Sequence, residues 1–304
     1  MPLRATLLYL SGHQGLRRWT ENSSLARRVS TRFVAGDTLE DALAVCRKIH
    51  GEGITATLDY LGENVRSLDE AAACRDMYLR MLSSMRNAGI EPNVSLKLTQ
   101  FGLDLSAETC EANFAMLVEA AAGMGGFVRV DMESSAYTDR TLRLVSRVHD
   151  RWGSCGTVIQ AYLLRSAGDV ETLNHKRIRV RLCKGAYLEP PAVAFSAKRM
   201  VDENYLSLAG ALLTGGEYPA IATHDERMLE GVRRFADGNG IDRSRFEFQM
   251  LYGIRRDLQR KLVADGYRLR LYVPFGEAWY PYFMRRLAER PANLLFLLRN
   301  LIRT

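Results

Sequence analysis

The chain has 304 residues, of which 47% are hydrophobic and 25% charged, which excludes a disordered or fibrous protein. This length fits either two ordinary domains or a single α/β barrel. The net charge of +7 favours attraction to anionic surfaces. Because the sequence has no zinc finger or RNP-like motif, we expect no nucleic-acid binding. No apolar run of about 18 residues and no signal-peptide cleavage site is present, so we expect a cytoplasmic protein.

The five cysteines are scattered along the chain, and none of them forms a CxxC pair. Their odd number and irregular spacing disfavour a disulfide framework and a zinc site. We therefore expect buried free thiols and no bound metal.

In chain order, residues 1–50 predict a small helical segment, and eight short β-rich runs follow it. The runs are Ile54–Tyr60, Val94–Leu98, Phe127–Met132, Thr157–Tyr162, Ile178–Cys183, Ala220–Thr223, Phe246–Met250 and Tyr267–Val273. Helical segments such as 67–89, 106–122 and 192–213 separate the runs, an order that implies parallel strands. Eight such units predict a closed (βα)8 TIM barrel over residues 51–304.

Apolar and polar residues alternate in several of these runs, although a buried parallel strand is usually apolar on both faces. In a barrel the outer face packs on helices, so the polar set is expected to point inward. The deeper polar positions, which we interpret mainly as a structural ion-pair network, are Arg129, Arg179, Glu247 and Arg270. The positions near the C-terminal strand ends, where barrel enzymes place their chemistry, are Lys97, Asp131, Arg181 and Tyr272.

The last predicted helix carries a polar stripe after Pro281. Tyr282, Arg285, Arg286 and Glu289 fall at i, i+3, i+4 and i+7 and therefore share one face. A solvated helix face is one explanation of the stripe. Paired guanidinium groups beside a tyrosine are nevertheless suited to binding a carboxylate.

Several hypotheses remain open on these residues alone. Lys97 at a strand end is compatible with a Schiff-base aldolase, and the positive charge with a basic nucleic-acid scaffold. His224 directly follows a strand, which fits either a loop-capping histidine or a functional one. Neither the aldolase nor the scaffold explains the stripe on the last helix.

Seven motifs in order along the chain resemble those of monofunctional bacterial proline dehydrogenases. They are SLKLTQFG at 95–102, VRVDMES at 128–134, VIQAYL at 158–163, RLCKGAY at 181–187, ATHD at 222–225, FEFQMLYG at 246–253 and LYVPFGEAWYPYFMRRLAER at 271–290. The resemblance implies a distorted (βα)8 barrel with N-terminal helices and with its last helix over the barrel mouth. It also implies FAD bound noncovalently at the C-terminal strand ends.

The same resemblance implies an activity. L-proline would be oxidised to 1-pyrroline-5-carboxylate by hydride transfer to flavin N5, as the first step of proline degradation to glutamate. The electrons would pass to a quinone, which implies peripheral contact with the inner face of the membrane. A separate pyrroline-5-carboxylate dehydrogenase would then take the product.

The resemblance also implies roles for individual residues. Asp131 and Arg181 would be catalytic, and Glu289 would form a supporting ion pair with Lys97. The residues that would bind the substrate are Lys97, Tyr272, Tyr282, Arg285 and Arg286. Those that would bind FAD are Met132, Gln160, Arg181, Lys184, Gly185, Ala186, Thr223 and His224.

Overall fold

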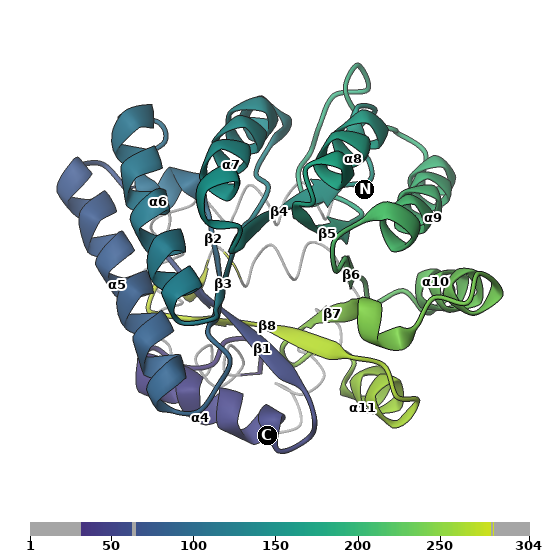
Figure 1. The fold of residues 1–304 in the computed structure, drawn as a ribbon, viewed down its shortest axis with the longest axis horizontal. Coiled ribbons are helices and arrows are strands. Elements are labelled where there is room, and N and C mark those ends of the chain that lie inside the picture. Colours follow the sequence, from purple (N-terminus) through teal and green to yellow (C-terminus); the bar gives the residue numbers. More distant parts are fainter. Residues whose placement is uncertain (1–31, 63–64, 281, 283–304) are drawn as a thin grey trace, which may run out of the picture.

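A computed structural model describes residues 32–62, 65–280 and 282 (Figure 1). Eight parallel strands form a closed barrel in the order β1 to β8. Their bounds are β1 Thr55–Tyr60, β2 Asn93–Leu96, β3 Phe127–Val130, β4 Cys155–Gln160, β5 Arg179–Cys183, β6 Ala220–Ala222, β7 Glu247–Leu251 and β8 Leu269–Phe275. The predicted (βα)8 barrel is confirmed.

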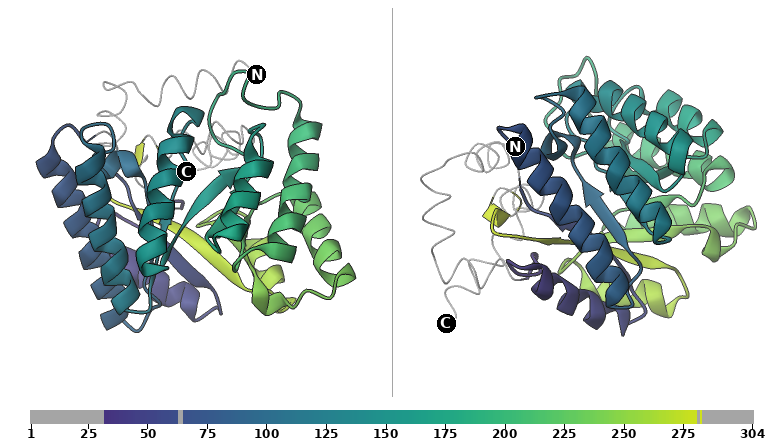
Figure 2. Two further views of the ribbon diagram at one scale, coloured as in Figure 1. Left: turned by 45° about the horizontal axis from the view of Figure 1, so that its top comes forward. Right: turned by 60° about the vertical axis from the view of Figure 1, so that its left-hand side comes forward.

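Helices surround the strands, as the views in Figures 1 and 2 show. Their bounds are α4 Leu39–His50, α5 Leu68–Asn87, α6 Ala107–Gly123, α7 Thr138–Trp152, α8 Ser166–His175, α9 Lys198–Gly215, α10 Glu226–Gly238 and α11 Arg256–Ala264. Several begin at a polar residue that caps the exposed N–H groups of the first turn. Ser67 accepts a bond from the Glu70 N–H, and Thr38 forms a capping box with Asp41. Within the described ranges, no helix combines the length and hydropathy that crossing a bilayer requires.

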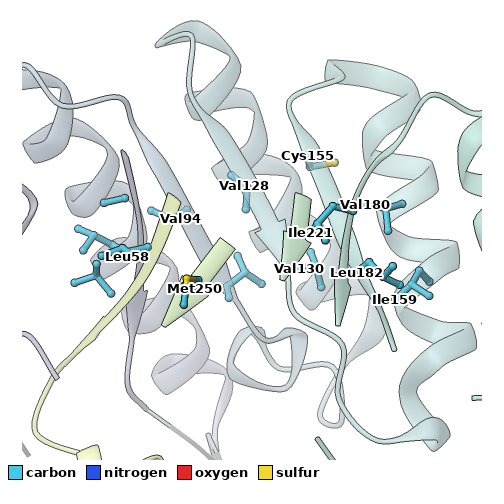
Figure 3. Close-up of a cluster of buried hydrophobic side chains, with 14 of the residues drawn as sticks. Leu58, Val94, Val128, Val130, Cys155, Ile159, Val180, Leu182, Ile221 and Met250 are labelled. Carbon is cyan, nitrogen blue, oxygen red and sulfur yellow. The ribbon is translucent and has the colours of Figure 1, made fainter. Parts of the chain in front are cut away.

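The apolar core lies between the outer face of the strands and the helices. Figure 3 shows part of it, including Leu58, Val94, Val130 and Leu182, all buried. Each belongs to the apolar half of an alternating strand, so the predicted direction of the two faces is confirmed. Four cysteines are buried free thiols, and Cys183 is half-buried. Burial raises the pKa of Cys46 and Cys155 to about 12, which leaves them inert at neutral pH.

The segment before the first strand packs on the barrel. Ala42, Cys46 and Ile49 of α4 belong to the same core as β1 and β8. The Ala35 N–H donates to the Pro274 carbonyl at 2.8 Å, which ties this segment to the end of β8. Residues 1–31 lie outside the described residues, and the division of the chain at residue 50 stays a prediction.

The strands differ from the predicted runs by one or two residues at one or both ends, and for two of them the structure shows the reason. β4 begins at Cys155 because Cys155 and Gly156 pair with β3. A Cβ atom at Gly156 would lie 2.2 Å from the Arg179 carbonyl oxygen, so this glycine permits close strand contact and does not mark a turn. β2 ends at Leu96, since a 3-10 turn, η1 (Leu98–Phe101), begins two residues later.

Candidate active site

Arg181 lies at the centre of the polar contacts inside the barrel. It projects from β5 and is 6% exposed. Its Nε donates to Gln249 Oε1 on β7 at 2.6 Å, Nη1 to Asp131 Oδ1 after β3 at 2.7 Å, and Nη2 to Ser95 Oγ on β2 at 2.8 Å. None of these strands neighbours β5, so the contacts cross the lumen. The guanidinium is therefore held by three sides of the barrel.

Asp131 joins Arg181 to Tyr272. The Tyr272 hydroxyl donates to Asp131 Oδ2 at 2.8 Å, while the other carboxylate oxygen accepts from Arg181. The Arg181 guanidinium also lies over the Tyr272 ring, 5.3 Å from its centroid. Loss of hydration and the negative charge of Asp131 hold the pKa of Tyr272 well above its usual range. Tyr272 is therefore a hydrogen-bond donor at all physiological pH values.

A column of polar groups continues from Gln249 toward the N-terminal end of the barrel. Gln249 donates through Nε2 to Glu247, which also accepts from Arg270 Nε at 2.9 Å. Arg270 Nη2 then reaches Glu91 at 3.1 Å. Burial alone would raise the pKa of Glu247, but the charge of Arg270 outweighs this and lowers it. Glu247 and Arg270 therefore form an ion pair, as the predicted network of deeper polar residues requires of its members.

Arg129 and Arg179 differ from that prediction. Arg129 Nη1 donates to the carbonyl oxygens of Thr157 at 3.2 Å and Arg179 at 2.7 Å, and its guanidinium lies 4.7 Å from the Phe127 ring centroid. Loss of hydration and the charge of Arg181 hold the pKa of Arg129 well below its usual range. Within the described ranges, the partners of these two arginines are carbonyls and rings, so of the four predicted network members Glu247 and Arg270 alone form an ion pair.

These arginines belong to a stack at the N-terminal end of the lumen. The guanidinium groups of Arg129 and Arg179 both lie close to the Phe127 ring, and those of Arg179 and Arg268 both lie close to the Tyr218 ring. The guanidinium-to-centroid distances run from 4.7 to 5.7 Å, within the range of cation–π attraction. Phe127 and Arg129 are each at most 5% exposed, whereas Arg179 and Tyr218 are half-buried and Arg268 is exposed, so the stack runs from the lumen to the surface at this end of the barrel.

The residues predicted to bind a carboxylate fall partly inside the described ranges. Lys97 directly follows β2 and is half-buried. Burial raises the pKa of the neighbouring Glu133, an effect opposed by hydrogen bonds from Thr99 and by the charge of Lys97. Tyr282 is 5% exposed. Arg285, Arg286 and Glu289 lie outside the described residues, so their predicted contacts, including the pair of Glu289 with Lys97, stay predictions.

The loop after β5 begins with Lys184 and Gly185. Lys184 Nζ donates to Asp202 on α9 and, at 2.8 Å, to Asp225 at the start of α10. Gly185 has φ +133°, and a Cβ there would lie 2.3 Å from the Tyr162 ring. Only glycine combines this backbone conformation with such close approach.

Two side chains connect this loop to the loops beside it. Gln160 at the end of β4 accepts from the Ala186 N–H at 3.1 Å and donates to the Glu133 carbonyl at 2.9 Å. Glu189 accepts from both the backbone N–H and the hydroxyl of Ser135. The loops after β3, β4 and β5 therefore form one hydrogen-bonded unit, which contains several of the residues predicted to bind FAD.

The remaining predicted cofactor residues follow β3 and β6. Met132 is 7% exposed and adjoins Asp131. Thr223 is 8% exposed, and its hydroxyl accepts from the Asp225 N–H at 3.1 Å. His224 Nε2 accepts from the Leu251 N–H at 2.9 Å, which places the proton of a neutral imidazole on Nδ1. His224 thus bonds the end of β7, whereas its contact with a cofactor stays a prediction.

Sequence reasoning assigned no role to several residues of this site. Ser95 and Gln249 belong to the inward polar set, and that alternation was the available signal. Asp202 and the pairing of Glu189 with Ser135 gave no sequence signal, because their partners are brought close only by the folded loops.

A closed parallel barrel with charged side chains gathered near its C-terminal strand ends defines a (βα)8-barrel enzyme. Residues 42–299 match the proline dehydrogenase family, and the chain belongs to this family of oxidoreductases. It is 41% identical over 280 residues to a proline dehydrogenase of Deinococcus radiodurans, with 90% of each chain covered. It is 38% identical over 301 residues to proline dehydrogenase 1 of Bacillus subtilis strain 168, with 99% of each covered.

Solved structures of bifunctional relatives share the fold. Proline utilization A from Bdellovibrio bacteriovorus, inactivated by N-propargylglycine, superimposes with a TM-score of 0.81 at 27% identity. The match covers 86% of this chain and 32% of that one. The chain thus resembles proline dehydrogenases of its own length from end to end, and one part of the larger bifunctional protein.

Proposed function

We propose that this protein oxidises L-proline to 1-pyrroline-5-carboxylate with FAD as its cofactor. The observation that supports this most strongly is the buried Arg181 guanidinium, fixed beside Asp131 and Tyr272 in the barrel of a proline dehydrogenase family member. A fixed cation in a site with little water stabilises negative charge more strongly than one in solution.

The residues present fit an FAD ring system. Arginine has five N–H groups, and among the described residues three of those on Arg181 are taken by Gln249, Asp131 and Ser95. One N–H on each terminal nitrogen is left to bind the cofactor. Gly185 and Ala186 offer backbone with almost no side chain, which lets a planar ring approach closely.

We propose that FAD is bound by the same residues that the sequence resemblance implies. They are Met132, Gln160, Arg181, Lys184, Gly185, Ala186, Thr223 and His224. The positive charge of Lys184 is already neutralised by its ion pairs with Asp202 and Asp225. Lys184 would therefore contribute a hydrogen bond of fixed direction to FAD, and not a net charge. When bound, FAD supplies the electron acceptor at N5 for the hydride from the ring carbon beside the proline nitrogen.

The chain itself would bind and orient the substrate. Lys97, Arg285 and Arg286 would hold the proline carboxylate, and Glu289 would support Lys97. Tyr272 and Tyr282 would cover the pyrrolidine ring and exclude water. Asp131 would fix the relative positions of the Arg181 and Tyr272 side chains, since it accepts a hydrogen bond from each. Catalysis in such a site depends on positioning rather than on a covalent intermediate with the protein.

Family membership disfavours the aldolase hypothesis for Lys97. We further propose that a quinone accepts the electrons through peripheral membrane contact, and that a separate pyrroline-5-carboxylate dehydrogenase takes the product.

Anaerobic titration with L-proline tests the proposal. The purified protein should be yellow, and proline should bleach its flavin absorbance in the absence of oxygen. A protein that binds no FAD, or whose FAD proline does not reduce, contradicts the proposed activity. Reduction of an artificial dye without reduction of quinone in liposomes would contradict only the proposed acceptor.

A further inference from the structure

We propose that Gln249 and Ser95 are positioning residues that set the orientation and the effective charge of Arg181. This inference rests on the proposed function, because it concerns how Arg181 acts on the bound cofactor. Gln249 and Ser95 would not touch the reacting atoms and would act only through the guanidinium group.

The geometry of Arg181 supports this role. Gln249, Asp131 and Ser95 each bind a different nitrogen of the guanidinium, Nε at 2.6 Å, Nη1 at 2.7 Å and Nη2 at 2.8 Å. A planar group held at three nitrogens from three strands has little freedom to rotate, so its two remaining N–H groups keep one direction. Preorganised donors of this kind need no rearrangement when charge develops.

The charges of the three acceptors differ in a way that affects function. Asp131 carries a negative charge, whereas the Gln249 amide and the Ser95 hydroxyl are neutral. Two of the three contacts therefore fix Arg181 without cancelling its positive charge. A carboxylate in either of these two places would hold the group equally well but would weaken its attraction for electrons on the cofactor.

Both positioning residues are themselves fixed. Gln249 Nε2 donates to Glu247, which is paired with Arg270, so the amide oxygen must face Arg181. The Ser95 carbonyl accepts from the fully buried Tyr78 hydroxyl at 2.9 Å, which anchors β2 to α5 at this residue. Ser95 is itself fully buried. Through Tyr78, the Ser95 support reaches from α5 to the lumen, and such outer support holds a functional group in place.

The test compares the variants Gln249→Met and Ser95→Ala with the FAD-loaded wild-type enzyme. We expect the midpoint potential of the bound flavin to fall in both, because the mobile guanidinium stabilises reduced flavin less well. The rate of anaerobic flavin reduction should fall by about tenfold or more, since misplacement by about 1 Å can cost 100-fold. The KM for proline should change by less than about threefold, because the carboxylate contacts are retained.

Two matched variants separate this role from simple loss of stability. Gln259→Met removes a buried glutamine of α11 whose side-chain amide donates to the backbone carbonyls of Leu251 and Ile254. Thr157→Val removes a buried hydroxyl that donates to the Val130 carbonyl. Both should lower the Tm without shifting the flavin potential.

The outcomes are distinguishable. If proline reduces the wild-type flavin but Gln249→Met and Ser95→Ala keep its potential and reduction rate, the inference is wrong while the proposed function holds. The inference is equally wrong if the control variants shift the potential as much as these two do. If Gln249→Met fails to fold, the smaller change Ser95→Ala decides alone. If proline does not reduce the flavin of the wild-type protein, the proposed function itself is wrong.

Discussion

Glu189 accepts two hydrogen bonds from Ser135, one from the backbone N–H at 2.7 Å and one from the hydroxyl at 2.5 Å. The contact spans two loops that are 54 residues apart in the chain and begin at different strands. It is a second connection between the loops after β3 and β5, which Gln160 also joins through Glu133 and Ala186.

Glu189→Gln should weaken FAD binding by about tenfold, since a hydrogen bond to a charged group contributes about 1.5 to 3 kcal/mol and an amide offers only one acceptor oxygen. The dissociation constant is measured by fluorescence titration of the apoprotein with FAD. Glu111→Gln, at a surface glutamate that accepts from Arg147, is the control and should bind FAD normally. Equal affinity in the two variants would show that the Glu189 contact does not support the cofactor loop.

Tyr272→Phe should slow flavin reduction by proline by about tenfold, because it removes a hydrogen bond to the charged Asp131 carboxylate. Stopped-flow absorbance under anaerobic conditions gives the rate constant. Tyr137→Phe removes a similar bond of 2.7 Å to Asp104 on the outside of the barrel and serves as the control. If Tyr272→Phe reduces its flavin as fast as Tyr137→Phe does, the Tyr272 hydroxyl has no part in catalysis.

Glu247→Gln should lower the free energy of unfolding by about 3 to 5 kcal/mol at pH 7, because the buried Arg270 cation loses its buried carboxylate partner and keeps only the more exposed Glu91 among its described ion pairs. Urea denaturation measures the difference. The exposed pair of Glu217 with Arg177 supplies the control, Glu217→Gln, for which we expect a change below about 1 kcal/mol.

The same pair predicts a pH dependence. Since folding lowers the pKa of Glu247, its contribution to stability is complete above the ordinary glutamate pKa of about 4.3 and is lost as the pH falls through the lower folded-state value. The stability gap between wild type and Glu247→Gln should therefore narrow on acidification below that pH. A gap that stays constant from pH 7 to pH 3 would contradict the pairing.

Arg285→Met should raise the KM for proline by orders of magnitude while FAD stays bound, because losing a buried charged contact costs about 2 to 5 kcal/mol. This prediction comes from the sequence resemblance, as Arg285 lies outside the described residues. Steady-state kinetics test it, with Arg234→Met on the exposed face of α10 as the control. An unchanged KM would exclude Arg285 from the substrate site.

The strands and the inward direction of their polar residues could be predicted because alternation is a local property of sequence. Arg181, Asp131 and Tyr272 were recognised in this way and through the family motifs. The partners of Arg181 could not be assigned, since Ser95 and Gln249 reach it only when the barrel closes and distant strands face each other. Arg129 and Arg179 were expected to pair with carboxylates, but sequence patterns do not reveal carbonyl oxygens and aromatic rings as partners.

The alternating stack of Arg129, Phe127, Arg179, Tyr218 and Arg268 has a consequence for turnover. Phe127 and Arg129, which are both buried, occupy the lumen at this end, so we expect a small molecule to reach Arg181 from the opposite, C-terminal end of the barrel. Proline, its product and the electron acceptor would then use the same entrance and bind in alternation, which is the pattern of a ping-pong enzyme. A compound lodged in that entrance should inhibit both half-reactions at once.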